Sequence, residues 1–219
     1  MDRPQPVSAE LEVDLHNLRQ LNRYFGSYRL IRHFLRRWIQ PGTPTRVLDL
    51  ATGSGDIPRL TADYARGIGA AIAIEAVDQQ SSTLEIAQQL STNYPEIKFV
   101  QGDILTLDRE PVDIVLCSLA LHHFTESDAV RLLQRCRELS KRYVLVADLR
   151  RGWLATGGVY VLTSLFFREP MTQIDARLSA ERAFSFAELR SLAERAGWGN
   201  FGHSNFLFAR QAIWLEETR

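Results

Sequence analysis

The chain has 219 residues, about the size of one large domain or two small ones. Hydrophobic residues make up 45% of it and charged residues 24%, a balance that supports a buried core and excludes disordered, collagenous and disulfide-scaffold proteins. Its 26 basic residues cancel its 26 acidic ones, so we expect no nucleic-acid partner. The 2 cysteines make neither a disulfide framework nor a zinc cluster, which favours a cytoplasmic protein.

No segment has the pattern of a signal peptide or of a membrane span. The first residues lack both the basic and the apolar part of a secretion signal. The longest uncharged stretch, Gly152–Phe167, has 16 residues and is shorter than a bilayer span. We therefore predict no stable membrane insertion.

Two helices are predicted before the main fold, over residues 11–25 and 31–39, with Gly26 between them. The second has apolar residues at helical spacing and arginines on its other face, which is typical of a helix packed on a domain with its charges in water. A membrane-surface helix is the alternative. Pro41-Gly42 ends this helix. We predict a helical extension over residues 1–44 that acts as a lid, followed by an α/β domain over residues 45–219.

From Thr45, short apolar runs alternate with amphipathic segments. Strands are predicted over residues 46–50, 70–77, 98–100, 112–117 and 143–147, and helices over 57–64, 82–90, 128–139 and 186–196. A closing pair of strands, broken near Ala209, is predicted over residues 201–214. This alternation predicts one α/β domain with a doubly wound, mostly parallel sheet that is covered on both faces.

The loop after the first strand has the features of a ligand-binding loop. The strand ends in Asp49, and Gly53 and Gly55 allow the backbone to approach a ligand closely. A dinucleotide fingerprint requires glycine where Pro58 stands, and Asp49 would repel a pyrophosphate. The same carboxylate favours a cofactor with a cationic amino-acid part.

The loops after the next strands agree with this interpretation. Asp78 follows the second strand, where a carboxylate accepts both ribose hydroxyls. Asp103 follows the third strand as a candidate acceptor for an adenine amine, with Ile104 against the ring. Ser118-Leu119 ends the fourth strand beneath the expected cofactor.

Together these motifs resemble the class I S-adenosylmethionine-dependent methyltransferases, over about residues 46–148. The motifs are D-x-A-x-G-x-G-D from Asp49, then Asp78, then Gly102-Asp103, then D-I-V-x-x-x-x-x-L-H-H from Asp113. Ala51, where most members have their first glycine, makes the loop similar to that of the ubiquinone and menaquinone C-methyltransferases. The resemblance implies S-adenosylmethionine as cofactor. It also implies a Rossmann-like seven-stranded sheet that is mostly parallel, with an antiparallel last strand.

The resemblance further implies where the cofactor lies. Asp49 and the backbone of residues 51–55 surround its methionine part, Asp78 binds the ribose and Asp103 the adenine. The helices before residue 45 and the segment after the fifth strand cover the acceptor. The residues expected to bind the cofactor are Asp49, Ala51, Thr52, Gly53, Ser54, Gly55, Asp78, Gln79, Gly102, Asp103, Ile104, Ser118 and Leu119.

Methyl transfer from a sulfonium depends mainly on alignment, and it needs a base only when the acceptor is protonated. His123 and His122 follow the fourth strand near the expected methyl group and are the candidate catalytic residues, with His123 slightly preferred. A packing role for both stays open. Asp148, which ends the fifth strand, is a second candidate to orient the acceptor. No metal site is predicted, because no histidine, cysteine and acid cluster has ligand spacing.

A small, aromatic or lipophilic acceptor such as a phenol or quinol is expected. Ser118-Leu119-Ala120-Leu121 stands where methyltransferases of DNA amines carry an acid or Asn followed by Pro-Pro and an aromatic residue. Two alternatives remain, a nicotinamide-dependent oxidoreductase of the same topology and a catalytically silent methyltransferase-like partner domain. A homodimer also stays open.

The apolar segment Gly152–Phe167 is predicted to be a buried helix. Either it forms a lid over the acceptor together with the N-terminal helices, or it fills core or a dimer interface.

Overall fold

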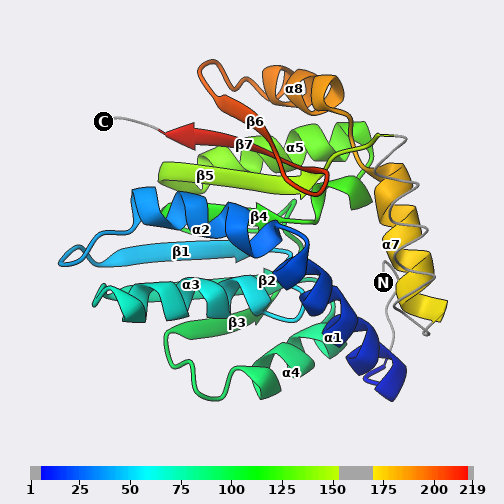
Figure 1. Ribbon diagram of the computed structural model, residues 1–219. Coiled ribbons are helices and arrows are strands. Elements are labelled where there is room, and N and C mark those ends of the chain that lie inside the picture. Colours follow the sequence, from blue (N-terminus) through cyan, green and yellow to red (C-terminus); the bar gives the residue numbers. More distant parts are fainter. Residues whose placement is uncertain (1–5, 153–169, 217–219) are drawn as a thin grey trace.

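The fold is built on one seven-stranded sheet with the strand order β3-β2-β1-β4-β5-β7-β6 (Figure 1). In the computed structural model, residues 6–152 and 170–216 are described. Only β7 runs antiparallel to its neighbours β5 and β6, and the other adjacent pairs are parallel. The predicted doubly wound, mostly parallel sheet with an antiparallel last strand is therefore confirmed. The strands are β1 (Thr45–Leu50), β2 (Ile72–Asp78), β3 (Ile97–Gln101), β4 (Val112–Ser118), β5 (Ser140–Leu149), β6 (Gly202–Phe206) and β7 (Arg210–Glu216).

Helices cover both faces of the sheet and its carboxyl edge. One face carries α2 and α3, and the other carries α5 and α8. In Figure 1, α1 and α7 lie on the right-hand side, where the parallel strands end. The helices are α1 (Ala9–Tyr24), α2 (Ser27–Trp38), α3 (Asp56–Gly67), α4 (Ser81–Leu90), the 3-10 turn η1 (Leu121–His123), α5 (Glu126–Glu138), α7 (Pro170–Arg182) and α8 (Phe186–Arg195).

The amphipathic helix α2 lies against the sheet as predicted. The face with Phe34, Leu35 and Trp38 is buried in the same core as Val47 of β1 and Ile114 of β4. Its arginines are exposed on the other face. Such burial of apolar side chains stabilises a domain by about 1.5–3 kcal/mol per residue, so α2 belongs to the packed structure. The division of the chain at residue 44 stays a prediction.

The helix α7 is absent from the sequence prediction, and its packing gives the reason. From Thr172 onward its buried residues are small, Thr172, Ala176 and Ala180, whereas Ile174 and Leu178 are 55% and 38% exposed. Ile174 and Leu178 therefore do not mark the face that packs. The predicted helix Gly152–Phe167 lies, except for Gly152, outside the described residues, which resume at residue 170.

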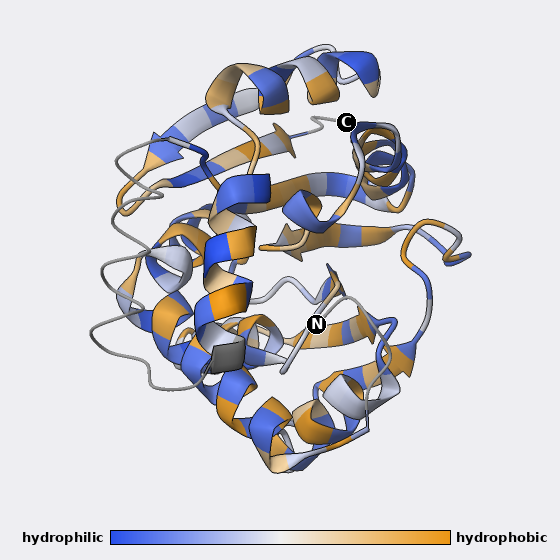
Figure 2. Ribbon diagram, turned by 90° about the vertical axis from the view of Figure 1, so that its right-hand side faces the viewer, coloured by the Kyte–Doolittle hydropathy of each residue, from blue (hydrophilic) through white to orange (hydrophobic). Residues whose placement is uncertain are grey.

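The helices seen from the carboxyl edge alternate between hydrophilic and hydrophobic residues (Figure 2). Among the described residues, no helix combines the length and the apolar character needed to cross a membrane.

Candidate functional site

The candidate site lies where the parallel strands end. The strand order reverses between β1 and β4, and in open α/β sheets ligands bind at such a switch point, outside the carboxyl ends of the strands. The loops after β1, β2 and β3 lie on one side of this point, and those after β4 and β5 on the other. The site is therefore divided into a β1–β3 half and a β4–β5 half.

The loop between β1 and α3 is held in a strained, open conformation. Gly55 caps α3 with φ 72°, and a Cβ added to it would lie 3.0 Å from the Phe99 ring. Ala51 also has a positive φ of 56°, a left-handed conformation that costs a residue other than glycine about 1 kcal/mol. Strain of this kind persists at ligand sites when the surroundings enforce it.

Asp78 ties this loop to the end of β2. Its Oδ2 accepts a hydrogen bond from Gly53 N at 2.8 Å, and its Oδ1 accepts one from Gln80 N at 3.0 Å. Burial raises the pKa of this carboxyl group, although these backbone donors oppose the rise. Each carboxylate oxygen has a second lone pair, so both can still accept from ligand hydroxyls.

Asp49 and Thr52 present buried oxygens that no described residue satisfies with a hydrogen bond. Asp49 is 2% exposed and Thr52 is 5% exposed. Asp49 Oδ1 and Thr52 Oγ1 have no hydrogen-bond partner among the described residues. Burial raises the pKa of Asp49 to about 8, with Asp56 and Asp78 adding to the rise and the nearby Thr52 hydroxyl opposing it. A cationic ligand group at this position would offset that cost.

The other predicted cofactor residues surround the same edge. Asp103 is exposed, and its Oδ1 accepts from Leu105 N at 2.9 Å, while Ile104 is buried. Leu119 has φ 55°, and its N–H donates to Ala147 O at 2.8 Å. The remaining contacts from predicted positions are Gly102 N to Asp78 O, Arg59 Nη1 to Ser54 O and Gln101 Nε2 to Gln79 O, while Ser118 pairs with Ala147 in the sheet.

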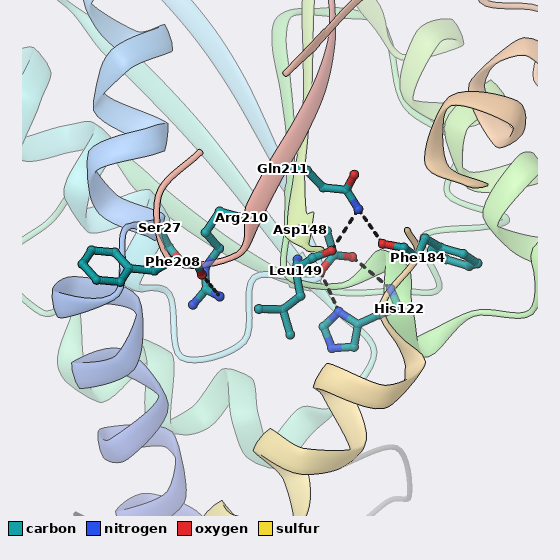
Figure 3. A network of polar contacts seen from close by, with 8 residues as sticks. All are labelled: Ser27, His122, Asp148, Leu149, Phe184, Phe208, Arg210 and Gln211. Carbon is teal, nitrogen blue, oxygen red and sulfur yellow. Dashed lines mark hydrogen bonds and ion pairs between the residues drawn. The ribbon is translucent and has the colours of Figure 1, made fainter. Parts of the chain in front are cut away.

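In the β4–β5 half, His122 and Asp148 form a buried pair (Figure 3). His122 Nδ1 lies 2.6 Å from Asp148 Oδ1, and Asp148 Oδ2 accepts from His122 N at 3.0 Å. Burial alone would raise the pKa of Asp148, but His122 and the backbone donors hold it below its usual value. His122 Nε2 is buried without a hydrogen-bond partner among the described residues.

The structure separates the two candidate histidines. His122 is 4% exposed and bonded to Asp148, whereas His123 is exposed, with its ring centroid 4.2 Å from that of His122. The geometry thus favours His122 as the candidate catalytic residue, whereas sequence analysis slightly preferred His123. Sequence analysis named both residues as candidates but not their contact, because it depends on the turn at Leu119, which leaves no local signal.

The helix α1 reaches the site from the N-terminal side. Asn22 Nδ2 donates to Asp56 Oδ2 at 3.0 Å, at the start of α3. Nearer the start of α1, Asp14 Oδ1 accepts a hydrogen bond from Thr172 Oγ1 of α7 at 2.8 Å. Two helices from distant parts of the chain therefore meet beside the carboxyl edge. Among the described residues, no group of His, Cys, Asp and Glu is arranged to hold a metal ion.

Comparisons with known proteins agree with this geometry. Residues 47–142 match the family model of a methyltransferase domain. A 2-phytyl-1,4-naphtoquinone methyltransferase of Thermosynechococcus vestitus is 32% identical over 87 residues, which cover 40% of this chain and 37% of that protein. A demethylmenaquinone methyltransferase of Thermotoga maritima is 31% identical over 142 residues, 58% of each chain. The match thus spans about a third to three fifths of these relatives.

Among solved structures, magnesium protoporphyrin IX methyltransferase from Synechocystis PCC 6803 with bound S-adenosylhomocysteine has the same fold. Its TM-score is 0.61 at 16% identity, covering 88% of this chain and 84% of that one. The chain thus has the fold of the class I S-adenosylmethionine-dependent methyltransferases, and its residues 47–142 match the model of a methyltransferase domain. Within that class its sequence resembles the quinone methyltransferases, as the motifs predicted.

Proposed function

We propose that the chain transfers a methyl group from S-adenosylmethionine to a small aromatic acceptor of the phenol or quinol type. The observation that carries this proposal is the buried His122–Asp148 pair at the carboxyl edge, next to a loop of the methyltransferase type. The quinone methyltransferases among its relatives support an aromatic acceptor. The balanced charge of the chain favours a small molecule over nucleic acid.

The β1–β3 half of the site fits the cofactor. When bound, S-adenosylmethionine supplies an electrophilic methyl group on a sulfonium. The unsatisfied Asp49 Oδ1 suits the amino group of its methionine part, and Asp78 suits the ribose hydroxyls. Asp103 and Ile104 would contact the adenine. Gly55 allows the sharp turn of this loop, because its φ is 72° and a Cβ there would press against the Phe99 ring.

His122 acts as the general base in this proposal. The ionised Asp148 accepts a hydrogen bond from Nδ1–H of His122, which leaves the lone pair of the ring on Nε2. This nitrogen, which has no partner among the described residues, takes the proton of an acceptor hydroxyl. Asp148 is then a positioning residue that fixes the tautomer and stabilises the imidazolium.

The alternatives differ in what the site would need. A nicotinamide-dependent oxidoreductase would place pyrophosphate over Asp49, and the methyltransferase-domain match disfavours it. A silent partner domain has no need for a buried, unsatisfied base.

We further propose that the acceptor lies between α1 and α7, which serve as its cover.

The experiment compares His122→Gln with His123→Gln, its neighbour in the same turn. S-adenosylhomocysteine binding is measured by calorimetry, and single-turnover transfer from labelled S-adenosylmethionine is measured on a panel of phenols and quinols. We expect His122→Gln to slow transfer by roughly 10²–10⁴-fold with cofactor affinity intact, because only the base is lost. The His123→Gln variant should stay close to wild type. Near-normal turnover in His122→Gln would contradict the assignment.

A further inference from the structure

Arg210, at the start of β7, is a buried cation without an ion-pair partner among the described residues. It is 8% exposed, its Nε donates to Ser27 Oγ at 2.9 Å, and its Nη1 makes a long bond of 3.4 Å to Phe208 O. No carboxylate within residues 6–152 and 170–216 lies within ion-pair distance of it. Burial lowers the pKa of this guanidinium to about 10, against the opposing effect of Asp148.

Arg210 lies at the same edge of the sheet as the proposed base, but its side chain projects from the α2 face, whereas Asp148 projects from the α5 face. In the antiparallel register, Arg210 pairs with Leu149, and Gln211 pairs with Asp148. In the view of Figure 3, the Leu149 side chain lies between the Arg210 guanidinium and the His122 ring. The Arg210 guanidinium and the His122 ring thus both lie near the end of β5, in the β4–β5 half of the site, where the acceptor is proposed to bind.

Both carboxylate oxygens of Asp148 accept hydrogen bonds from other groups, and Asp148 does not pair with Arg210 directly. Its Oδ1 accepts from His122 Nδ1 and from Leu149 N at 2.6 Å, and its Oδ2 accepts from His122 N. The hydrogen bond to Ser27 needs only Nε of the guanidinium. Of the two Nη nitrogens of the guanidinium, only Nη1 has an acceptor among the described residues, and this is the distant Phe208 O.

A buried guanidinium that lacks an ion pair is costly, and its geometry suits one ligand class above others. The fork of an arginine binds a carboxylate through two parallel hydrogen bonds. We propose that Arg210 recognises a carboxylate carried by the acceptor beside the group that is methylated. This inference rests on the proposed function and narrows its substrate class to acidic phenols.

The test uses two probes that differ only in the acid group, 2,5-dihydroxybenzoate and hydroquinone. Each is titrated by calorimetry into protein saturated with S-adenosylhomocysteine, for wild type, Arg210→Met and Arg210→Lys. The control is Arg142→Met, which removes an exposed arginine from the other end of β5. Melting curves report the stability of every variant.

We expect wild type and Arg142→Met to bind the carboxylate probe about 10- to 100-fold more tightly than hydroquinone. Arg210→Met should lose this preference without losing hydroquinone, and Arg210→Lys should keep part of it. Equal affinities in wild type, or no binding of either probe, would overturn the proposal. An equal loss of both probes in Arg210→Lys with a lowered melting temperature would also overturn it, because it would assign Arg210 to the fold. Binding of S-adenosylhomocysteine, measured first, tests the proposed function separately.

Discussion

At the scale of single residues, Asp49 makes the site costly before any ligand binds. Its carboxyl group is buried at the end of β1, with Asp56 and Asp78 nearby, and burial raises its pKa to about 8. Near neutral pH the folded protein without ligand therefore holds a proton there that the unfolded chain releases. A ligand ammonium would favour the charged form. This residue links cofactor affinity, stability and pH.

Cofactor affinity should therefore rise with pH. Between pH 6 and pH 8, we expect the affinity for S-adenosylhomocysteine to increase by roughly 10- to 100-fold, because Asp49 must lose its proton to meet the ammonium. Calorimetry in two buffers of different ionisation enthalpy should show a proton released on binding. Asp49→Asn should bind weakly and without this pH dependence. A flat profile in wild type would show that Asp49 does not meet the amine.

The stability of the protein without ligand should change with pH in the opposite direction, so it should fall as the pH rises. A carboxyl pKa raised from 3.8 to about 8 means that stability is lost as pH rises through this range. Asp49→Asn should thus raise the free energy of unfolding at pH 8 by about 1 kcal/mol or more, and change it little at pH 4. Urea unfolding at the two pH values measures this. An Asp49→Asn protein that is less stable than wild type at pH 8 would contradict the argument.

At the scale of elements, α1 and α7 form the cover of the carboxyl edge through one buried polar contact. Asp14 accepts from Thr172 Oγ1, and Asn17 Nδ2 donates to the same hydroxyl at 3.1 Å. Burial raises the pKa of Asp14 to about 6, and Asp175 of α7 adds to the rise. The hydrogen bond from Thr172 opposes this rise, but burial dominates, so the folded protein is more stable when Asp14 is protonated.

Asp14→Asn should strengthen the cover above pH 6, because the amide oxygen still accepts from Thr172 and no charge is buried. We expect up to about 1 kcal/mol of added stability at pH 7.5, since solvent screens part of the shift, and no gain at pH 4. Thr172→Ala removes the donor and should destabilise at pH 7.5. Hydrogen exchange of the backbone amides in α1 and α7 measures how stably these two helices hold together. Faster exchange in Asp14→Asn at pH 7.5 would refute this account.

At the scale of the whole molecule, the sequence predicts what depends on local pattern and on parallel strands. Asp49 and Asp78 could be predicted to meet, because strands that alternate with helices end at one edge, and the Gly53–Asp78 bond joins their loops. The pairing of Asp148 with His122 depends on the turn at Leu119, and the contact of Ser27 with Arg210 spans 183 residues. Neither leaves a local signal. The helix α7 escaped prediction because it packs through small side chains.

Calorimetric titration of the full chain with S-adenosylhomocysteine decides whether this edge of the sheet is a methyl-donor site. We predict that wild type binds and that NADH does not compete. Asp78→Ala should lose about 2–4 kcal/mol, roughly 30- to 1,000-fold in affinity, because Asp78 holds the Gly53 loop and, in the proposed function, also the ribose. Asp108→Ala, an exposed acid farther along the loop after β3, is the matched control and should bind like wild type. Absence of binding by wild type, or unchanged affinity in Asp78→Ala, would contradict the account.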